Sequence, residues 1–287
     1  MITSAVSVLF DGFAYGMLLF LLSVGLSVTL GMMNFVNLAH CAFAMIGGYV
    51  TVTLMNRVGW PFLATLPIAF IVAAAISVVF ERTMFRRLYR ASELDQCLLT
   101  IGVVFVSIAV TAYVFSTSQQ PVSLPNYLRG SISVGAMTFG VYRIFLIVFA
   151  VIVSAALIGA LEFTRFGAQI RAAVDNQRMA RGLGINVDGA FAIAFALGSG
   201  LAGLGGALAI DVVGLDPSFA LVYLVYVLIV VAVGGLASIR GTFAAAMLLG
   251  ISDMAGKYYF PAIGSFLIYL VMISLLMWRP SGIFGRR

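Results

Sequence analysis

The sequence has few charged residues. Of its 287 residues only 9% are Asp, Glu, Lys or Arg, whereas an ordinary soluble domain carries about a quarter. In contrast, 63% of the residues are hydrophobic and the mean hydropathy is +1.14. So few charges cannot cover the surface of a soluble enzyme, and so apolar a chain cannot remain disordered. The composition therefore predicts a polytopic membrane protein whose main solvent is lipid.

Residues that bind metals or carry out catalysis are also scarce. His40 is the single histidine, and the cysteines Cys41 and Cys97 stand in or beside apolar stretches without CxxC spacing. One imidazole without neighbouring cysteines or carboxylates cannot complete a zinc site. The chain has no GxxxxGK(S/T) phosphate-binding loop, no HExxH and no GxSxG in a catalytic context. We therefore expect no enzyme activity and no cofactor of its own.

Nine apolar runs divide the chain: 5–30, 41–56, 61–80, 97–115, 143–161, 189–213, 219–236, 242–255 and 262–278. Only helices fit such continuous runs, because a lipid-exposed backbone must satisfy its own hydrogen bonds. Runs 41–56 and 242–255 are too short for a hydrocarbon core of about 30 Å, so each must extend into its flanks or break inside the membrane. The predicted fold is all-α: a polytopic helical membrane protein of eight or nine transmembrane helices, some short or broken, in a single domain 1–287.

The basic residues predict the orientation. The net charge is +6, but the basic residues are spread over several loops, so we expect no nucleic acid partner. If all nine runs cross the membrane, twelve of the 16 basic residues fall on one side and four on the other side or its borders. The side with the excess is expected to be cytoplasmic. The N-terminus, which lacks the basic start of a cleaved signal peptide, is then outside, and the C-terminus is inside.

The longest polar stretch between two crossings is 166–186, FGAQIRAAVDNQRMARGLGIN, on the expected cytoplasmic side. Its alanines favour one short helix, which the Gly182–Gly184 pair would end. The stretch is either a solvated loop whose arginines only fix the topology or a helix that docks into a cytoplasmic partner. On the docking interpretation a small alanine face enters a groove, and a bulky charged residue at Ala173 or Gly182 uncouples transport.

A polar break, GMMNFVNLAH, joins the first two apolar runs. Asn34, Asn37 and His40 are spaced so that they would share roughly one face of a helix. Polar groups at membrane depth are tolerated where they face a cavity or another helix. The alternative is a helix-breaking loop at the interface, with His40 hydrogen-bonded to the backbone.

A second break, GGLASIRGTF, precedes the other short run and contains Gly234, Gly235 and Ser238. Interrupted, short helices in a transporter mark the substrate path. The residues of both breaks are therefore the predicted path residues: Asn34, Asn37, His40, Gly234, Gly235 and Ser238.

Small residues recur every four positions at Ala194, Gly198, Ala202 and Gly206. Such a stripe lets two helix backbones approach closely. We expect helix packing here rather than phosphate binding, because this apolar run contains no basic residue.

Four stretches carry sequence patterns that occur together in one family. They are GLSVTLGMMNFVNLAHCAFAMIGGYV (25–50), RAAVDNQRMARGLGIN (171–186), GGLASIRGTF (234–243) and RPSGIFG (279–285). In this order they resemble the opening, the coupling segment, the late Gly-Gly-x-x-Ser loop and the terminus of the branched-chain amino acid permeases of ABC transporters. The spacing from Asn34 to His40 is longer than in one branch of that family. The length of the chain is similar to that of the shorter of the two permease subunit types.

The resemblance implies a division of labour in a prokaryotic inner membrane. This chain and a second permease subunit, or a second copy, would form the pathway for branched-chain amino acids or similar small polar solutes such as amides, urea and aromatic acids. Two cytoplasmic ATPase subunits would bind the ATP, and a periplasmic binding protein would deliver the substrate. Segment 166–186 would couple to the ATPase through Arg171, Ala172, Ala173, Asp175, Asn176, Ala180, Gly182, Gly184 and Ile185.

A stand-alone secondary carrier or channel is the alternative function. A proton-driven carrier places carboxylates near the middle of the membrane. The acidic residues of the apolar runs stand near their ends, and only Asp253 is close to a central position. This distribution favours a chain that takes its energy from a partner.

Overall fold

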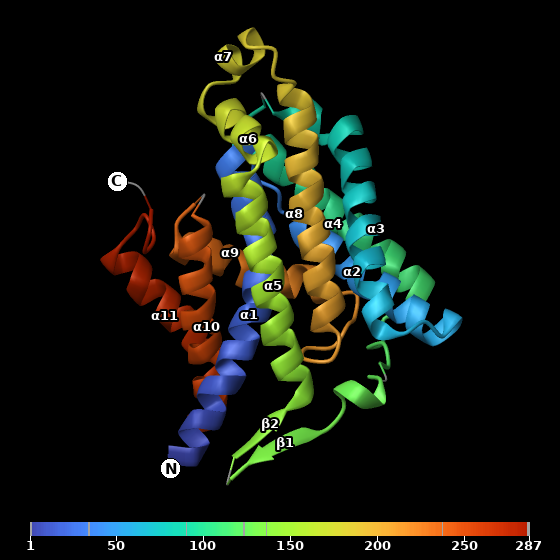
Figure 1. The fold of residues 1–287 in the computed structure, drawn as a ribbon, viewed down its shortest axis with the longest axis vertical. Helices are drawn as coiled ribbons and strands as arrows, with labels where there is room; N and C mark the ends of the chain where they lie inside the picture. The colour runs from blue at the N-terminus through green and yellow to red at the C-terminus, as the bar shows by residue number, and fades with distance from the viewer. Residues whose placement is uncertain are drawn as a thin grey trace.

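The structure is a computed structural model, and it describes residues 2–33, 35–89, 91–122, 124–135, 137–236 and 238–285. The chain forms an elongated bundle of helices, and a short β-hairpin lies at the end of the bundle where the N-terminus is found (Figure 1). The hairpin pairs β1 (Ser131–Val134) with β2 (Met137–Gly140) in antiparallel register. The predicted all-α membrane class is confirmed.

The described ranges contain eleven α-helices. They are α1 (Ile2–Met33), α2 (His40–Thr53), α3 (Phe62–Thr83), α4 (Glu93–Phe115), α5 (Val141–Phe163), α6 (Arg165–Asp175), α7 (Gln177–Gly182), α8 (Val187–Ala209), α9 (Phe219–Gly234), α10 (Ile239–Tyr259) and α11 (Gly264–Trp278). Each of the nine apolar runs overlaps one helix, and the remaining two, α6 and α7, form the polar segment. The hydrophobic pattern therefore located every long helix of the bundle.

The number of spans is lower than the expected eight or nine. Within the described part of the chain, six helices are long and apolar enough to cross a membrane, or up to seven spans exist if the pair α9–α10 is taken as one. Helices α9 and α10 bend by 120° at their junction, and α11 has only 15 residues. The difference thus arises in the last three runs, where glycine and proline shorten the helices.

The two short runs do extend into their flanks. Helix α2 continues through a π-helical turn, Leu54–Val58, to give a span of 19 residues that ends at Gly59 in a left-handed conformation. Helix α10 has 21 residues and begins at Ile239, three residues before the apolar run. The helical structure is therefore interrupted in the links before α2 and α10 rather than inside these two helices.

Helix α8 lies at the centre of the bundle and packs closely against α1 and α2. A methyl group on Gly25 of α1 would collide with the carbonyl of Gly198, and one on Gly206 would collide with the carbonyl of Ala44 in α2. Gly198 and Gly206 belong to the predicted stripe of small residues, whose packing role is confirmed. Where two helix backbones are in such close contact, a larger side chain at either glycine cannot be accommodated by small shifts of its neighbours.

Helices α3, α4 and α5 form the outside of the bundle. Large apolar side chains such as Ile71, Val106 and Ile152 are exposed on them, in contrast to the almost completely buried α1 and α8. In lipid an exposed apolar face is solvated rather than aggregation-prone. The outer helices therefore present the apolar outer surface of this chain, and the inner helices α1 and α8 carry the packing.

Candidate functional site

The polar segment 166–186 lies at the end of the bundle opposite the N-terminus and the hairpin (Figure 1). It forms two short helices rather than the single one expected. Asn176 ends α6, and its side-chain Oδ1 accepts a hydrogen bond from the N–H of Met179 at 3.0 Å, which caps α7. Gly184, with φ +80°, then turns the chain toward α8. The glycine stop was predicted correctly, whereas the asparagine break inside the segment was not.

Helix α6 is anchored to its own chain. Thr164 caps it by accepting a hydrogen bond from the N–H of Gly167 at 3.2 Å, and Arg171 donates to the carbonyl of Leu161 at the end of α5. Ile170 and Ala173 are fully buried. Helix α6 is therefore a fixed base at the end of the bundle rather than a free arm.

Two alanines of the expected docking face are not on the surface of this chain. Ala173 and Ala180 are buried within the chain, because an alanine face is small enough to pack against the neighbouring helices of its own bundle. A charge at position 173 would disturb this packing, so such a variant cannot test docking. Among the other predicted coupling residues, Arg171, Asn176, Gly182 and Gly184 are exposed, and Ala172 and Ile185 are half-buried. Asp175 is the last residue of α6, and its side chain lies outside the described part of the structure.

Two apolar residues that sequence reasoning missed stand out on α7. Met179 is 66% exposed and Leu183, four residues later, is 79% exposed. Residues four apart lie on the same side of a helical turn, so the two side chains form one apolar knob at the tip. The polar stretch also contains Phe166, Ile170, Val174 and Ile185, so no pattern in the sequence singled out this pair.

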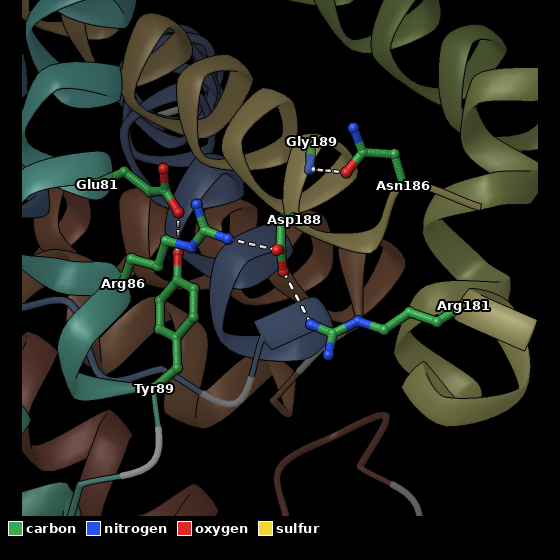
Figure 2. A network of polar contacts seen from close by, with 7 residues as sticks. All are labelled: Glu81, Arg86, Tyr89, Arg181, Asn186, Asp188 and Gly189. Carbon is green, nitrogen blue, oxygen red and sulfur yellow. Dashed lines mark hydrogen bonds and ion pairs between the residues drawn. The ribbon is translucent and has the colours of Figure 1, made fainter. Parts of the chain in front are cut away.

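An acidic residue links this tip to the membrane helices. Asp188, in the first turn of α8, accepts a hydrogen bond at Oδ1 from Arg181 Nη2 of α7 at 2.9 Å, and its Oδ2 pairs with Arg86 (Figure 2). Arg86 lies in a 3₁₀ turn, Phe85–Leu88, between α3 and α4. Asp188 thus joins α7, α8 and the α3–α4 link through two ion pairs.

These ion pairs are accessible to water. The side chains are 51% exposed for Arg86, 52% for Arg181 and 44% for Asp188. Exposed pairs stabilise a fold by only about 0–1 kcal/mol each, so they can break and form again at little cost. Exposed contacts of this kind suit a connection whose geometry changes. We call the three residues Arg86, Arg181 and Asp188 the joint.

A second polar contact beside this joint is buried. Tyr89 donates a hydrogen bond to Glu81 Oε1 at 2.7 Å, and Glu81 is 2% exposed (Figure 2). Burial, followed by the bond to Glu81, raises the pKa of the Tyr89 hydroxyl well above its ordinary value. The hydroxyl therefore remains a proton donor and holds the end of α3 in place next to the joint.

The break between α1 and α2 does not place its polar residues on one helix face. Asn37 lies in the non-helical link, and His40 is the first residue of α2; Asn34 lies outside the described residues. His40 is fully buried, and its Nε2 is 2.9 Å from the carbonyl oxygen of Leu22 in α1. The alternative prediction, a helix-breaking loop with His40 bonded to backbone, describes this link better than a polar helix face does.

Asn37 nevertheless remains a candidate path residue. Its side chain is 1% exposed, and neither its amide nitrogen nor its amide oxygen has a hydrogen-bond partner among the described residues. Leaving a buried polar atom unpaired costs about 1–3 kcal/mol. An unpaired amide beside the core is a group that a passing solute or water can satisfy.

The second break is closed by the C-terminal segment. Gly234 ends α9, Gly235 follows in a left-handed conformation with φ +96°, and Ser238 caps α10 by accepting from the N–H of Gly241 at 3.0 Å. The N–H groups of Ile283 and Phe284 donate to the carbonyls of Val233 and Gly234 at 2.8 and 3.2 Å. The motifs GGLASIRGTF and RPSGIFG are therefore partners in space, and the last residues of the chain satisfy the open carbonyl end of α9.

The two breaks approach α1 at one level. His40 of the first break contacts the carbonyl of Leu22, and Phe243, which follows the second break, packs edge to face on Phe20 at 5.3 Å between ring centroids. No hydrogen bond between the two breaks is found among the described residues. Among the predicted path residues, His40 thus contacts this turn of α1 directly, whereas the second break reaches it only through Phe243, which is not one of them.

The clearest polar cavity lies elsewhere, near the hairpin. It has a volume of about 380 Å³, and Arg129, Arg143 and Asp211 are among its lining residues. Burial raises the pKa of Asp211 above its ordinary value, and Arg143 opposes this shift. Two further cavities, of about 550 and 340 Å³, have mostly apolar linings; the first lies mainly along α3, and the second lies between α2 and α4. None of the described lining residues of these three cavities is a predicted path residue.

The sequence was compared with known proteins. The sequence model of the family described as "Branched-chain amino acid transport system / permease component" matches residues 8–276. The high-affinity branched-chain amino acid transport system permease protein BraD of Pseudomonas aeruginosa is 26% identical, over 97% of this chain and 95% of the relative. The permease protein LivH of Escherichia coli K12 is 25% identical over 97% and 94%, and a probable branched-chain amino acid permease of Methanocaldococcus jannaschii is 27% identical over 94% and 90%. No solved structure gives a significant match.

Proposed function

The chain belongs to the family of branched-chain amino acid transport system permease components, and from that premise we propose that it is a permease subunit of an ATP-driven importer. The proposed cargo is branched-chain amino acids or similar small polar solutes such as amides, urea and aromatic acids. The relatives with which it aligns over nearly their whole length are transport permeases rather than enzymes. The chain is therefore a multi-pass membrane protein that provides part of a pathway and receives its energy from a partner.

The observation that carries this proposal is the apolar knob of Met179 and Leu183 on its fixed base. Helix α6 is held to α5 through Arg171, and it carries α7 at the far tip of the bundle. An exposed apolar pair rimmed by exposed charges, here Arg178 and Arg181, is typical of a site that binds another protein. We propose that the knob enters a groove on a cytoplasmic ATPase, with one ATPase for each of two permease subunits.

Through Asp188, movement at the docking contact would be transmitted to the membrane helices. A displacement of α7 moves Arg181, and Arg181 holds Asp188 in the first turn of α8. Helix α8 cannot move without α1 and α2, because their backbones meet at glycines such as Gly25 and Gly206. We propose that closure of the ATPase pair therefore shifts α8, α1 and α2 as one unit and switches the pathway between its two orientations.

The basic residues at this end of the molecule support the proposed orientation in the membrane. Arg165, Arg171, Arg178 and Arg181 all lie in the α6–α7 segment, at the end opposite the hairpin (Figure 1). The positive-inside rule then assigns this end to the cytoplasm of a prokaryotic inner membrane. The N-terminus and the β1–β2 hairpin lie on the outer side, where a periplasmic binding protein would deliver the substrate, and the C-terminus lies inside.

Reconstitution tests the proposed function. The chain is placed in proteoliposomes with the three proposed partners, an ATPase, a second permease and a binding protein, and uptake of labelled L-leucine is measured with and without ATP. We expect uptake only with ATP and the complete set of proteins. Uptake by the purified chain alone, driven by an ion gradient, would instead identify a stand-alone carrier and overturn the proposal.

A docking variant makes this test specific. Replacing both Met179 and Leu183 by Asp exchanges the apolar knob for charge at exposed positions, where the fold is insensitive to the change. We expect uptake to be lost while the variant remains monodisperse. The matched control is Leu94→Asp in the first turn of α4, which is 68% exposed and lies outside both the knob and the hairpin, and it should retain uptake.

A further inference from the structure

One carboxylate in the outer half of the bundle is buried and only half satisfied. Asp253 of α10 is 0% exposed, and its Oδ2 accepts a hydrogen bond from Lys257 Nζ, one turn later, at 2.6 Å. Its Oδ1 has no hydrogen-bond partner among the described residues. A buried carboxylate oxygen without a partner is costly, and acidic residues within membrane helices are expected to serve a function.

Aromatic rings surround this carboxylate. Lys257 Nζ lies 5.6 Å from the centre of the Tyr15 ring of α1. Tyr223 and Tyr226 of α9 stack with ring centres 5.7 Å apart, and Tyr226 is followed by Tyr269 of α11 at 6.4 Å. Helix α10, which carries Asp253 and Lys257, packs against α1, α9 and α11, the helices that carry these four tyrosines.

In this structure the ammonium group of Lys257 occupies the location beside Asp253. A cation is recognised in proteins by a carboxylate together with the face of an aromatic ring within about 6 Å. The ammonium of Lys257 contacts both the Asp253 carboxylate and the face of the Tyr15 ring. At the same time, 45% of the Lys257 side chain is exposed. A lysine that is partly in contact with the outside can withdraw and free Asp253, because its four-carbon stem is flexible.

We propose that Asp253, Lys257 and the four tyrosines form a transient binding site for a zwitterionic amino acid in the permease itself, which Lys257 occupies when no substrate is present. The ammonium of the substrate would replace that of Lys257 and use both oxygens of Asp253. Lys257 would then bind the substrate carboxylate, and the apolar side chain would lie on the tyrosine rings. This inference rests on the proposed function for the class of cargo.

The test compares an amino acid, which carries an ammonium and a carboxylate, with analogues that carry only one of the two groups. The full-length chain is reconstituted in lipid nanodiscs, and equilibrium binding is measured for labelled L-leucine, for isoamylamine, which lacks the carboxylate, and for isocaproate, which lacks the ammonium. We expect L-leucine to bind more tightly than either analogue. Equal binding of all three, or no binding of L-leucine, would overturn the proposal.

Two variants separate recognition from folding. Asp253→Asn preserves the shape of the side chain and should weaken L-leucine binding by about tenfold, because a hydrogen bond to a charged group is lost. Lys257→Gln removes the competing ammonium, so binding of isoamylamine should become tighter than in the parent chain while binding of L-leucine weakens. A purely structural ion pair would not produce these opposite changes. Glu93→Gln, at an exposed position in the first turn of α4, is the control and should bind all three as the parent does.

The outcome is independent of the test of ATP-driven uptake. If the complete set of proteins takes up L-leucine and Asp253→Asn binds it as well as the parent chain does, the importer stands and this site is wrong. If L-leucine binds through Asp253 but uptake does not require ATP, the site stands and the importer is wrong.

Discussion

The centre of the bundle and its α6–α7 tip are built in opposite ways. In the centre, α8 meets α1 and α2 through glycines whose backbones leave no room for a methyl group, as at Gly25 and Gly206. At the tip, Asp188 is connected to its neighbours through exposed ion pairs. Close backbone packing moves as one unit, whereas exposed ion pairs can be exchanged at little cost. The comparison suggests a stiff membrane core that is moved through an adjustable joint.

The largest effect is expected from filling the glycine contact in the centre. Gly206→Leu forces a side chain into the carbonyl of Ala44 and should lower the free energy of unfolding by about 3 kcal/mol or more, because overpacked cores cannot adjust. Gly159→Leu on α5 is the control, since a Cβ at Gly159 has open space around it. Thermal unfolding in nanodiscs measures both. Equal stabilities for the two variants would show that the centre is not rigid.

A smaller effect on stability, but a large one on coupling, is expected at the joint. Asp188→Asn should change the stability by less than about 1 kcal/mol, yet it should lower transport per ATP hydrolysed by about tenfold, a usual size for coupling between sites. Asp188→Asn combined with Arg181→Gln should be no worse than Asp188→Asn alone, because both changes break the same contact. If the two losses were simply additive, Arg181 and Asp188 would not act as one joint.

An effect on stability alone, smaller than that of Gly206→Leu, is expected where the C-terminal segment contacts the end of α9. Gly235→Ala adds a methyl group at φ +96°, next to the backbone of Gly285, and should destabilise the protein by about 1–2 kcal/mol. Gly59→Ala is the matched control, because Gly59 has φ +74° but nothing within reach of a Cβ. Limited proteolysis of the C-terminus and thermal unfolding measure the difference. If both alanines cost the same, only backbone strain is involved and the closure has no role.

The sequence was informative about the membrane part because lipid imposes a strong pattern. Each apolar run became a helix, and the small residues from Ala194 to Gly206 did mark a packing face. The polar segment was harder to interpret, since the alanine face that was expected to bind a partner packs inside the chain at Ala173. The knob of Met179 and Leu183 has the composition of residues that are usually buried, so its exposure became visible only in three dimensions.

The contacts that complete the site are the least accessible from sequence. Arg86 and Asp188 are separated by 102 positions. Ile283 bonds to Val233 at the end of α9, although two helices, α10 and α11, lie between them in the sequence. No local pattern indicates such pairs. The link of Asn37 and His40 was expected to be either a helix face or a loop, and the distance from His40 to the carbonyl of Leu22 decided for the loop.

The most direct test of the docking account is a cross-link from the knob. Cys41 and Cys97 are replaced by Ala, Met179 is replaced by Cys, and the assembled transporter is treated with a short bifunctional maleimide; Ile132→Cys in the hairpin is treated in parallel. The account predicts a covalent product with the ATPase from position 179 and none from position 132. An active transporter that gives no ATPase product from position 179, or an equal product from position 132, would contradict it.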